Sequence, residues 1–120
     1  MKLRIHGRSL RLRLKPSEIA ELAQTGRVED RVDLSPESAL IFAIQSSDVE
    51  SMAVQLEGST ITVLLSRAEV EQWTGTDLVG IEAQSPTENG ALTVLVEKDF
   101  KCLHRPSSGD DADTYPHPDA

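Results

Sequence analysis

The stretch Lys2-Leu3-Arg4-Ile5-His6-Gly7-Arg8-Ser9-Leu10-Arg11-Leu12-Arg13-Leu14 decides the fold class of this chain. Apolar and polar residues alternate along it, which is the pattern of β-strands with one buried and one exposed face. Gly7 separates two such runs and predicts a tight hairpin, because glycine adopts positive φ without strain. We therefore expect the chain to open with two antiparallel strands whose exposed face is basic.

The same pattern returns 51 positions later, which indicates an internal duplication. The first copy contributes Met1, Gly7, Leu14, Glu18, Thr25 and Val28, and these are identical to Met52, Gly58, Leu65, Glu69, Thr76 and Val79. Each copy is predicted to fold as strand–strand–helix–strand–strand. We expect a first repeat over 1–50 and a second over 51–103, together forming a single domain over 1–103.

Each predicted helix has a recognisable start and stop. Ser66-Arg67-Ala68-Glu69 is a capping box, in which the serine and the glutamate satisfy exposed backbone groups at the helix start. The matching stretch has Pro16 at the first helical position, after the poorer cap Lys15. Gly26 and Gly75 are predicted to end the helices. The strand pairs that close the copies are expected at 28–34 with 40–46 and at 78–84 with 91–97.

The fold class that follows is α+β. The two ββαββ repeats are expected to form a mainly antiparallel eight-stranded sheet or barrel, with both helices packed on one face. Trp73 occupies an apolar helical position and is predicted to lie in the core. Alternation assigns the following strand residues to the core: Leu3, Ile5, Leu10, Leu12, Leu14, Phe42, Ile44, Val54, Leu56, Ile61, Val63, Leu65, Val94 and Val96.

Composition narrows the class of protein. The chain has 120 residues, a formal net charge of −8 and a single cysteine, Cys102, so it cannot hold an internal disulfide. No apolar run approaches the ~18 residues that a membrane-spanning helix needs, and no signal peptide is evident. We expect a cytoplasmic protein with no membrane partner. Residues 104–120 lack periodicity and are expected to form an extended acidic tail.

The net charge conceals an asymmetry. Residues 1–15 hold six of the twelve basic side chains and no acid, so six bases face twenty acids in the rest of the chain. Alternation places Arg4, Arg11 and Arg13 on one face, and together with Lys15 they are the candidate anion-binding residues. The competing interpretation is that acids of the fold neutralise them. The candidate counter-ions are Glu29, Asp33, Asp110, Asp111 and Asp113.

Other chemistries find little support in the sequence. Nucleic acid is not an expected partner, because the chain is acidic and no aromatic residue is interleaved with the basic ones. Cys102 and His104, with His117, lack the second clustered pair that a zinc site requires. Neither a nucleophile elbow nor a glycine-rich phosphate loop is present. We predict no catalytic residues, no metal and no cofactor.

The face opposite the expected helices combines charge with apolar residues that are unusual in water, namely Ile41, Ala43, Leu64 and Leu95. This mixture is typical of an interface with a polar rim. The leading hypothesis is a small non-enzymatic binding or regulatory protein that uses this face for a protein partner or a second copy of itself. The alternative is an enzyme that binds an anionic small molecule, a phosphate ester or polyphosphate, through the basic N-terminal hairpin.

The sequence resembles an uncharacterised family of small bacterial cytosolic proteins, to which no function is attached. The resemblance lies in the opening MKLRIHGRSLRLRL, in Ser17-Glu18-Ile19 and in the closing EKDFKCL with its acidic tail. The expected architecture is also similar to the triphosphate tunnel enzymes, which hold a triphosphate with inward basic residues and a metal with glutamates. That likeness implies a lining of Arg4, Arg11, Arg13, Arg31, Glu57, Glu82 and Glu97.

Overall fold

The computed structural model describes residues 1–100 and contains two helices and eight strands. The strands are β1 (Lys2–His6), β2 (Ser9–Leu14), β3 (Arg27–Ser35), β4 (Ser38–Ser47), β5 (Ala53–Glu57), β6 (Thr60–Ser66), β7 (Gly80–Thr87) and β8 (Gly90–Lys98). The helices are α1 (Pro16–Thr25) and α2 (Arg67–Gly75). The predicted α+β class is confirmed. Neither helix has the length and apolar character needed to cross a membrane.

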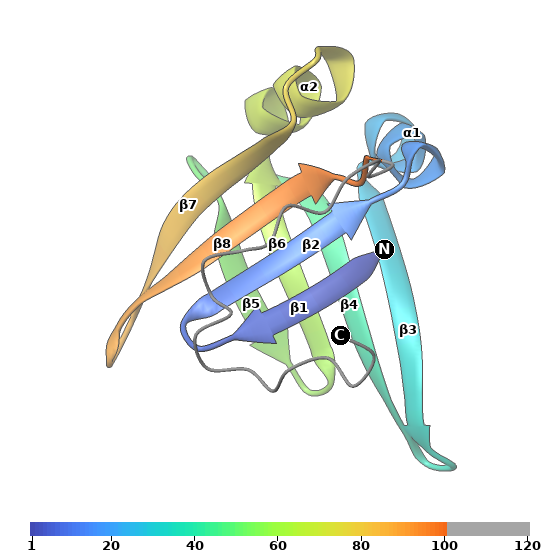
Figure 1. Ribbon diagram of the computed structural model, residues 1–120, viewed down its shortest axis with the longest axis vertical. Coiled ribbons are helices and arrows are strands. Elements are labelled where there is room, and N and C mark those ends of the chain that lie inside the picture. The colour runs from blue at the N-terminus through green and yellow to red at the C-terminus, as the bar shows by residue number, and fades with distance from the viewer. Residues whose placement is uncertain (101–120) are drawn as a thin grey trace, which may run out of the picture.

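The strands divide into two four-stranded sheets (Figure 1). Sheet A has the order β1-β2-β8-β7, and sheet B has the order β3-β4-β6-β5. Hairpin neighbours pair antiparallel, whereas the central pairs β2–β8 and β4–β6 are parallel. Each sheet thus joins one hairpin from the N-terminal half of the chain to one from the C-terminal half.

This topology corrects the expected eight-stranded sheet or barrel. Because β2 pairs with β8 and β4 pairs with β6, each of these four central strands is hydrogen-bonded to a strand on both sides. β1, β7, β3 and β5 remain as edges, so two mixed sheets form instead of one closed surface. The tunnel lining expected from the triphosphate enzymes therefore does not assemble.

The first hairpin of each half turns at a glycine, as predicted. Gly7 has φ 56° and Gly58 has φ 57°, values that side chains disfavour. The closing hairpins are longer than expected, with only 36–37 and 88–89 between their strands. Pro86, expected in a loop, lies within β7, an edge strand of sheet A, which is where a sheet tolerates proline.

The predicted helix starts are confirmed. At α2, Ser66 Oγ accepts from the Glu69 N–H at 3.1 Å, and the Glu69 carboxylate accepts from the Ser66 N–H at 2.9 Å. At α1, only the glutamate half operates, with Glu18 accepting from the Lys15 N–H at 2.9 Å.

The predicted helix ends are confirmed only in part. α1 ends at Gly26, which has φ 80°. Gly75 instead remains the last residue of α2, and Thr76 follows in an extended conformation. The Thr76 hydroxyl accepts from the Leu78 N–H at 3.1 Å, so a side chain supports this exit from the helix.

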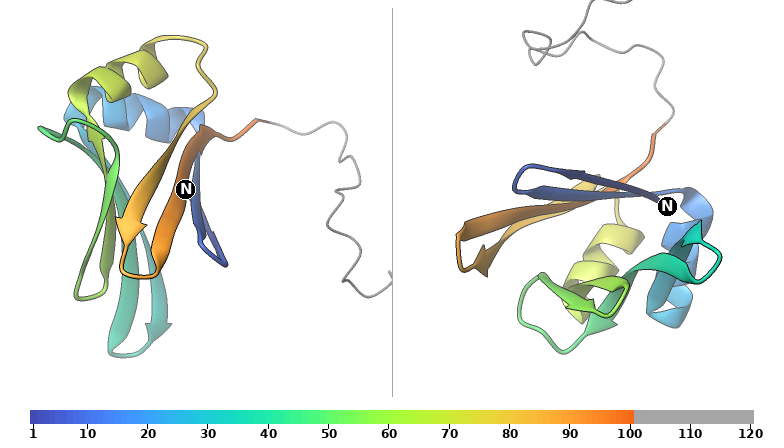
Figure 2. Two further views of the ribbon diagram at one scale, coloured as in Figure 1. Left: turned by 90° about the vertical axis from the view of Figure 1, so that its left-hand side faces the viewer. Right: turned by 90° about the horizontal axis from the view of Figure 1, so that it is seen from below.

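The core lies between the two sheets, and the helices close one end of it (Figure 2). Sheet A contributes Leu12, Leu14 and Val96, while sheet B contributes Ile44, Val63 and Leu65, all fully buried. α1 packs on β2, β3 and β4, and α2 packs on β4, β6 and β7, so each helix contacts both sheets. The helices thus do not cover one face of a single sheet, as expected, but lie across the end shared by both.

Trp73 confirms its predicted place in the core with no exposed surface. Its indole N–H donates to the Val79 carbonyl at 3.0 Å, which satisfies the one polar group of the ring. The far end of the two sheets is less well covered. Ile5 and Leu56, predicted as core, are 59% and 70% exposed, because no helix reaches that end.

Candidate functional site

The basic residues of the first hairpin lie on the outer face of sheet A. Alternation turns Leu10, Leu12 and Leu14 inward, where all three are buried. The opposite face of β1 and β2 then carries Lys2, Arg4, Arg11 and Arg13, which we call the basic face. Cross-strand register sets Arg4 directly opposite Arg11 and Lys2 directly opposite Arg13. Like charges in this position repel one another.

The parallel partner β8 brings one acid to this face. Register places Leu95 beside Arg11 and Glu97 beside Arg13. The Glu97 carboxylate accepts from Arg13 Nε at 2.6 Å and forms a longer ion pair with Arg11 Nε at 3.5 Å. A single carboxylate therefore serves two guanidinium groups, and it holds Arg13 more closely than Arg11.

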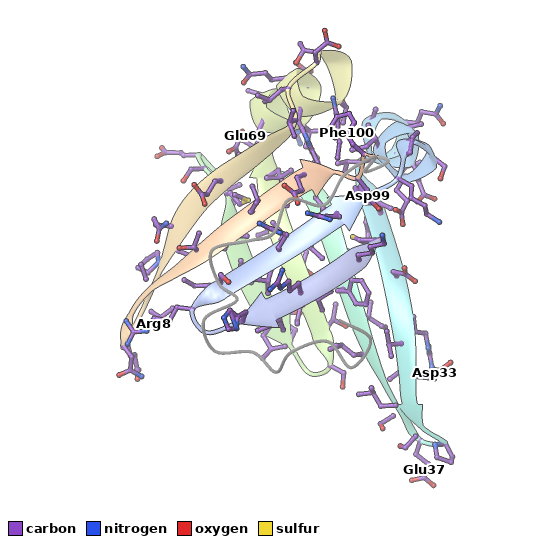
Figure 3. The ribbon with its side chains drawn as sticks, viewed as in Figure 1. Arg8, Asp33, Glu37, Glu69, Asp99 and Phe100 are labelled. Atoms are coloured by element: carbon purple, nitrogen blue, oxygen red, sulfur yellow. The ribbon has the colours of Figure 1, made fainter. Side chains whose placement is uncertain are left out.

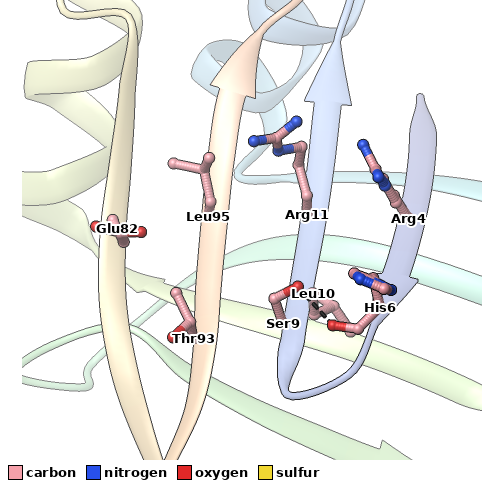
Figure 4. Close-up of a pocket in the computed structure, with 8 residues that line it drawn as sticks. All are labelled: Arg4, His6, Ser9, Leu10, Arg11, Glu82, Thr93 and Leu95. Carbon is pink, nitrogen blue, oxygen red and sulfur yellow. Dashed lines mark hydrogen bonds between the residues drawn. The ribbon is translucent and has the colours of Figure 1, made fainter. Parts of the chain in front are cut away.

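A pocket of about 220 Å³ opens beside these residues on the outer face of sheet A (Figure 4). It is lined by Arg4, His6, Ser9, Leu10, Arg11, Glu82, Thr93 and Leu95. Figure 4 shows Arg4 and Arg11 on neighbouring strands, with Glu82 on the far side of Leu95. The lining thus combines two guanidinium groups, an imidazole, a carboxylate and two hydroxyl groups with two leucines.

The hydroxyl groups of the pocket already have partners. Ser9 Oγ donates to the His6 carbonyl at 2.7 Å, as the dashed line in Figure 4 marks. The Thr93 and Gln84 side chains bond to each other at 3.0 and 3.2 Å. By contrast, Arg4 forms no ion pair within residues 1–100. Arg4 therefore differs from Arg11 and Arg13, which both contact Glu97.

Three of the four predicted anion-binding residues come together. Arg4, Arg11 and Arg13 share the basic face, but Lys15 does not, because it follows β2 and caps α1. The charge of Lys15 acts instead toward Asp30, whose carboxyl pKa lies below its usual value. The largest cause of that low pKa is a hydrogen bond from the Arg31 N–H, and the N-terminal ammonium and Lys15 lower it further.

The expected counter-ions among the described residues are on the wrong sheet. Glu29 pairs with Arg27 at 3.2 Å, and Asp33 pairs with Arg31 at 3.0 Å, both on β3 of sheet B. Figure 3 shows Asp33 on this strand and Asp99 where the chain leaves β8. Among residues 1–100, Glu97 and Asp99 do pair with the basic face, and Asp99 bonds Lys2 Nζ at 3.1 Å. Asp110, Asp111 and Asp113 lie outside the described residues.

The apolar residues expected to share one interface are also separated. Ile41, Ala43 and Leu64 lie on sheet B, whereas Leu95 lies on sheet A. Ala43 is fully buried and Leu64 is 8% exposed, so neither offers much surface to a partner. The prediction that these four residues form a single interface patch is therefore wrong. The homodimer remains a prediction, but these residues no longer support it.

The sequence did not point to the neighbours that β8 supplies. Thr93, Leu95 and Glu97 lie beside the basic hairpin only because β8 runs parallel to β2. No local sequence signal indicates that β2 and β8 pair, because the sequence of each strand predicts only a hairpin with its neighbour in the chain. Within residues 1–100, no group of three or more His, Cys, Asp or Glu side chains is arranged to hold a metal ion. Cys102, His104 and His117 fall outside that range.

Comparison with known proteins gives a family but no activity. No curated protein and no solved structure matches this chain. One family does match, described as a family of unknown function, DUF7009, and the match runs over residues 1–119. It includes both sheets and continues past the described residues into the acidic C-terminal segment. Because that match covers nearly the whole chain, the protein belongs to the family of unknown function DUF7009.

Proposed function

We propose that this protein is a binding protein that takes an oxyanion, a carboxylate or phosphate group of its partner, on the basic face. The observation that carries the proposal is the cross-strand pair Arg4–Arg11 at the pocket. Two cations held opposite each other lower stability unless an anion lies between them. Their guanidinium groups are suited to grip such an anion through two parallel hydrogen bonds.

The state of the nearby acids supports the same conclusion. Glu97 contacts Arg11 only at 3.5 Å, whereas its bond to Arg13 is 2.6 Å long. Glu82 also lines the pocket, but it forms no ion pair with either arginine. Arg4 and Arg11 thus retain donor capacity for an external ligand. Leu95, which is only partly exposed, provides an apolar floor beneath it.

The pocket favours binding over catalysis. A nucleophilic serine needs a base within hydrogen-bonding reach, but Ser9 Oγ donates its proton to a backbone carbonyl instead. The Thr93 hydroxyl is likewise engaged with the amide of Gln84. Neither hydroxyl is prepared to attack a phosphate ester. The phosphate-ester or polyphosphate enzyme considered from the sequence has no comparable support.

The experiment is an anion-binding titration of wild type and three single variants. Phosphate, pyrophosphate, tripolyphosphate and citrate are titrated by calorimetry, and thermal shift is recorded in parallel. We expect tripolyphosphate to raise the Tm of wild type by several degrees. Arg4→Gln and Arg11→Gln should each weaken binding by about tenfold or more, because each removes a charge-assisted hydrogen bond.

Arg31→Gln is the matched control, since Arg31 is an exposed arginine on the outer face of sheet B. It should bind tripolyphosphate like wild type. Arg4→Gln should also be at least as stable as wild type, because it relieves repulsion from Arg11. Equal affinity in all four proteins, or absence of binding in wild type, would refute the proposal.

We propose further that the two halves arose by duplication and form one domain that ends near residue 103. Supporting this are the 51-residue offset in sequence and the ββαββ order of elements in each half. The glycine turns Gly7 and Gly58 also have matching positive φ values of 56° and 57°. The test is limited proteolysis, in which a stable core ending near residue 103 and resisting internal cleavage is expected.

A further inference from the structure

We propose that the C-terminal segment 101–120 of the chain itself occupies the basic face when no external anion is bound, with Asp110, Asp111 and Asp113 against Arg4 and Arg11. The inference rests on the proposed function, because it assigns an internal competitor to the same site. It makes the acidic segment a regulator of anion affinity.

The point where the described chain ends favours this occupant. The Asp99 N–H donates to the Leu14 carbonyl at 2.9 Å, which holds the end of β8 beside the end of β2. The described chain therefore ends beside sheet A, next to the strand that carries Arg11 and Arg13. Asp99 already pairs with Lys2 of the basic face at 3.1 Å, so the acids that follow extend an existing contact.

The length of the segment is sufficient. Asp110 follows Phe100 by ten positions, and an extended chain covers about 33 Å over that number. Arg11 lies beside Leu95, five residues back from Phe100, or at most about 17 Å along the chain. The segment can therefore turn back and reach the pocket with slack. The entropy cost of closing such a loop grows only slowly with its length.

Charge supplies the specificity. Three of the four residues in 110–113 are aspartates, whereas the basic face holds four cations and one shared glutamate. A tethered acidic segment is present at millimolar effective concentration, so weak contacts are enough to compete with a dilute ligand. The family match runs over residues 1–119, so it includes both sheet A and most of the C-terminal segment.

The test uses the full chain with the three aspartates neutralised together, Asp110→Asn, Asp111→Asn and Asp113→Asn. The matched control neutralises three exposed acids elsewhere, Glu21→Gln, Glu71→Gln and Asp77→Asn, which form no ion pairs within residues 1–100. Tripolyphosphate is the probe. We expect the first variant to bind it about three- to tenfold more tightly than wild type, and the control to stay within about twofold of wild type.

A second measurement tests the contact between the C-terminal aspartates and the arginines even if tripolyphosphate does not bind. Without added anion, the NMR signals of the Arg4 and Arg11 Nε–H groups are compared among the three proteins. These signals should move in the first variant and not in the control, and Arg31 should not move in either. Such movement without tripolyphosphate binding would uphold the internal contact and refute the external one. Unmoved arginine signals, or equal affinity in the first variant and the control, would overturn the inference.

Discussion

The outer faces of the two sheets occupy equivalent places in the fold but carry different chemistry. The order β1-β2-β8-β7 in sheet A corresponds to β5-β6-β4-β3 in sheet B, and the pairings match. Across sheet A one row of register partners reads Arg4, Arg11, Leu95 and Glu82. The corresponding row of sheet B reads Gln55, Thr62, Ala43 and Glu29. The architecture therefore does not require the cations of sheet A, which points to a role in binding.

The two faces also differ in how their charges are satisfied. On sheet B, Arg27 contacts Glu29 at 3.2 Å and Gln45 at 2.6 Å, so the cation at this edge has acceptors on its own and the neighbouring strand. On sheet A, Arg4 forms no ion pair within residues 1–100. Within the described residues, the arginine at the edge of sheet B is thus paired, whereas Arg4 of sheet A is not.

The largest expected effect comes from removing a glycine of sheet A. Gly80 corresponds to Arg27 of sheet B, yet a Cβ at Gly80 would lie too close to the Val96 carbonyl oxygen for any side chain. Gly80→Ala should lower the free energy of unfolding by about 2 kcal/mol, because backbone must move to make room. Arg27→Ala should cost under about 1 kcal/mol. Urea denaturation of both variants measures the difference, and equal losses would contradict a close approach specific to sheet A.

A smaller effect follows from making β8 resemble β4. Glu97 corresponds to Gln45 of sheet B, so Glu97→Gln copies that residue into sheet A. The variant should lose about 1 kcal/mol of stability, since the charge-assisted bond to Arg13 becomes neutral. Its affinity for tripolyphosphate should rise severalfold, because the acid that competes for Arg11 is gone. An unchanged affinity would show that Glu97 does not limit anion binding.

The smallest effect concerns pH and lies on sheet B. Asp30 corresponds to Ala83 of sheet A, so Asp30→Ala again copies one sheet into the other. Its lowered pKa means that ionised Asp30 stabilises the fold at pH values above the ordinary value of 3.8, and that this contribution is lost as the pH falls through the folded pKa. The variant should be less stable than wild type by under about 1 kcal/mol at pH 7.

That difference should shrink as the pH is lowered from 7 toward 2, because the carboxyl takes up a proton in the folded chain as the pH falls through its lowered pKa. Denaturation curves of wild type and Asp30→Ala at both pH values make the comparison. The same difference at pH 7 and pH 2 would assign the effect to packing rather than charge.

Local features of the fold could be predicted from the sequence, whereas the neighbours of the strands could not. The turns at Gly7 and Gly58, the capping box at Ser66 and the burial of Trp73 each depend on residues close together in the chain. Alternation also assigned Arg4 and Arg11 correctly to a common face.

Alternation does not reveal which strands lie side by side. The parallel pairs β2–β8 and β4–β6 link opposite halves of the chain, and they divide the predicted charged face between two sheets. For that reason the sequence does not identify Glu97 as the partner of Arg13, and the prediction of Glu29 and Asp33 as counter-ions of the basic residues is wrong.

The parallel pairing of β2 with β8 has a consequence for how the protein is made. β2 ends at Leu14 and β8 begins at Gly90, so the N-terminal hairpin is synthesised 76 positions before its partner strand. At about 5–20 residues per second, a ribosome leaves the β2 edge without its neighbour for roughly 4–15 s. An uncovered strand edge is prone to pair with other nascent chains, and mutual repulsion between cationic hairpins opposes that pairing. The arginines of this hairpin are therefore expected to oppose edge-to-edge pairing between nascent chains while β8 is still missing.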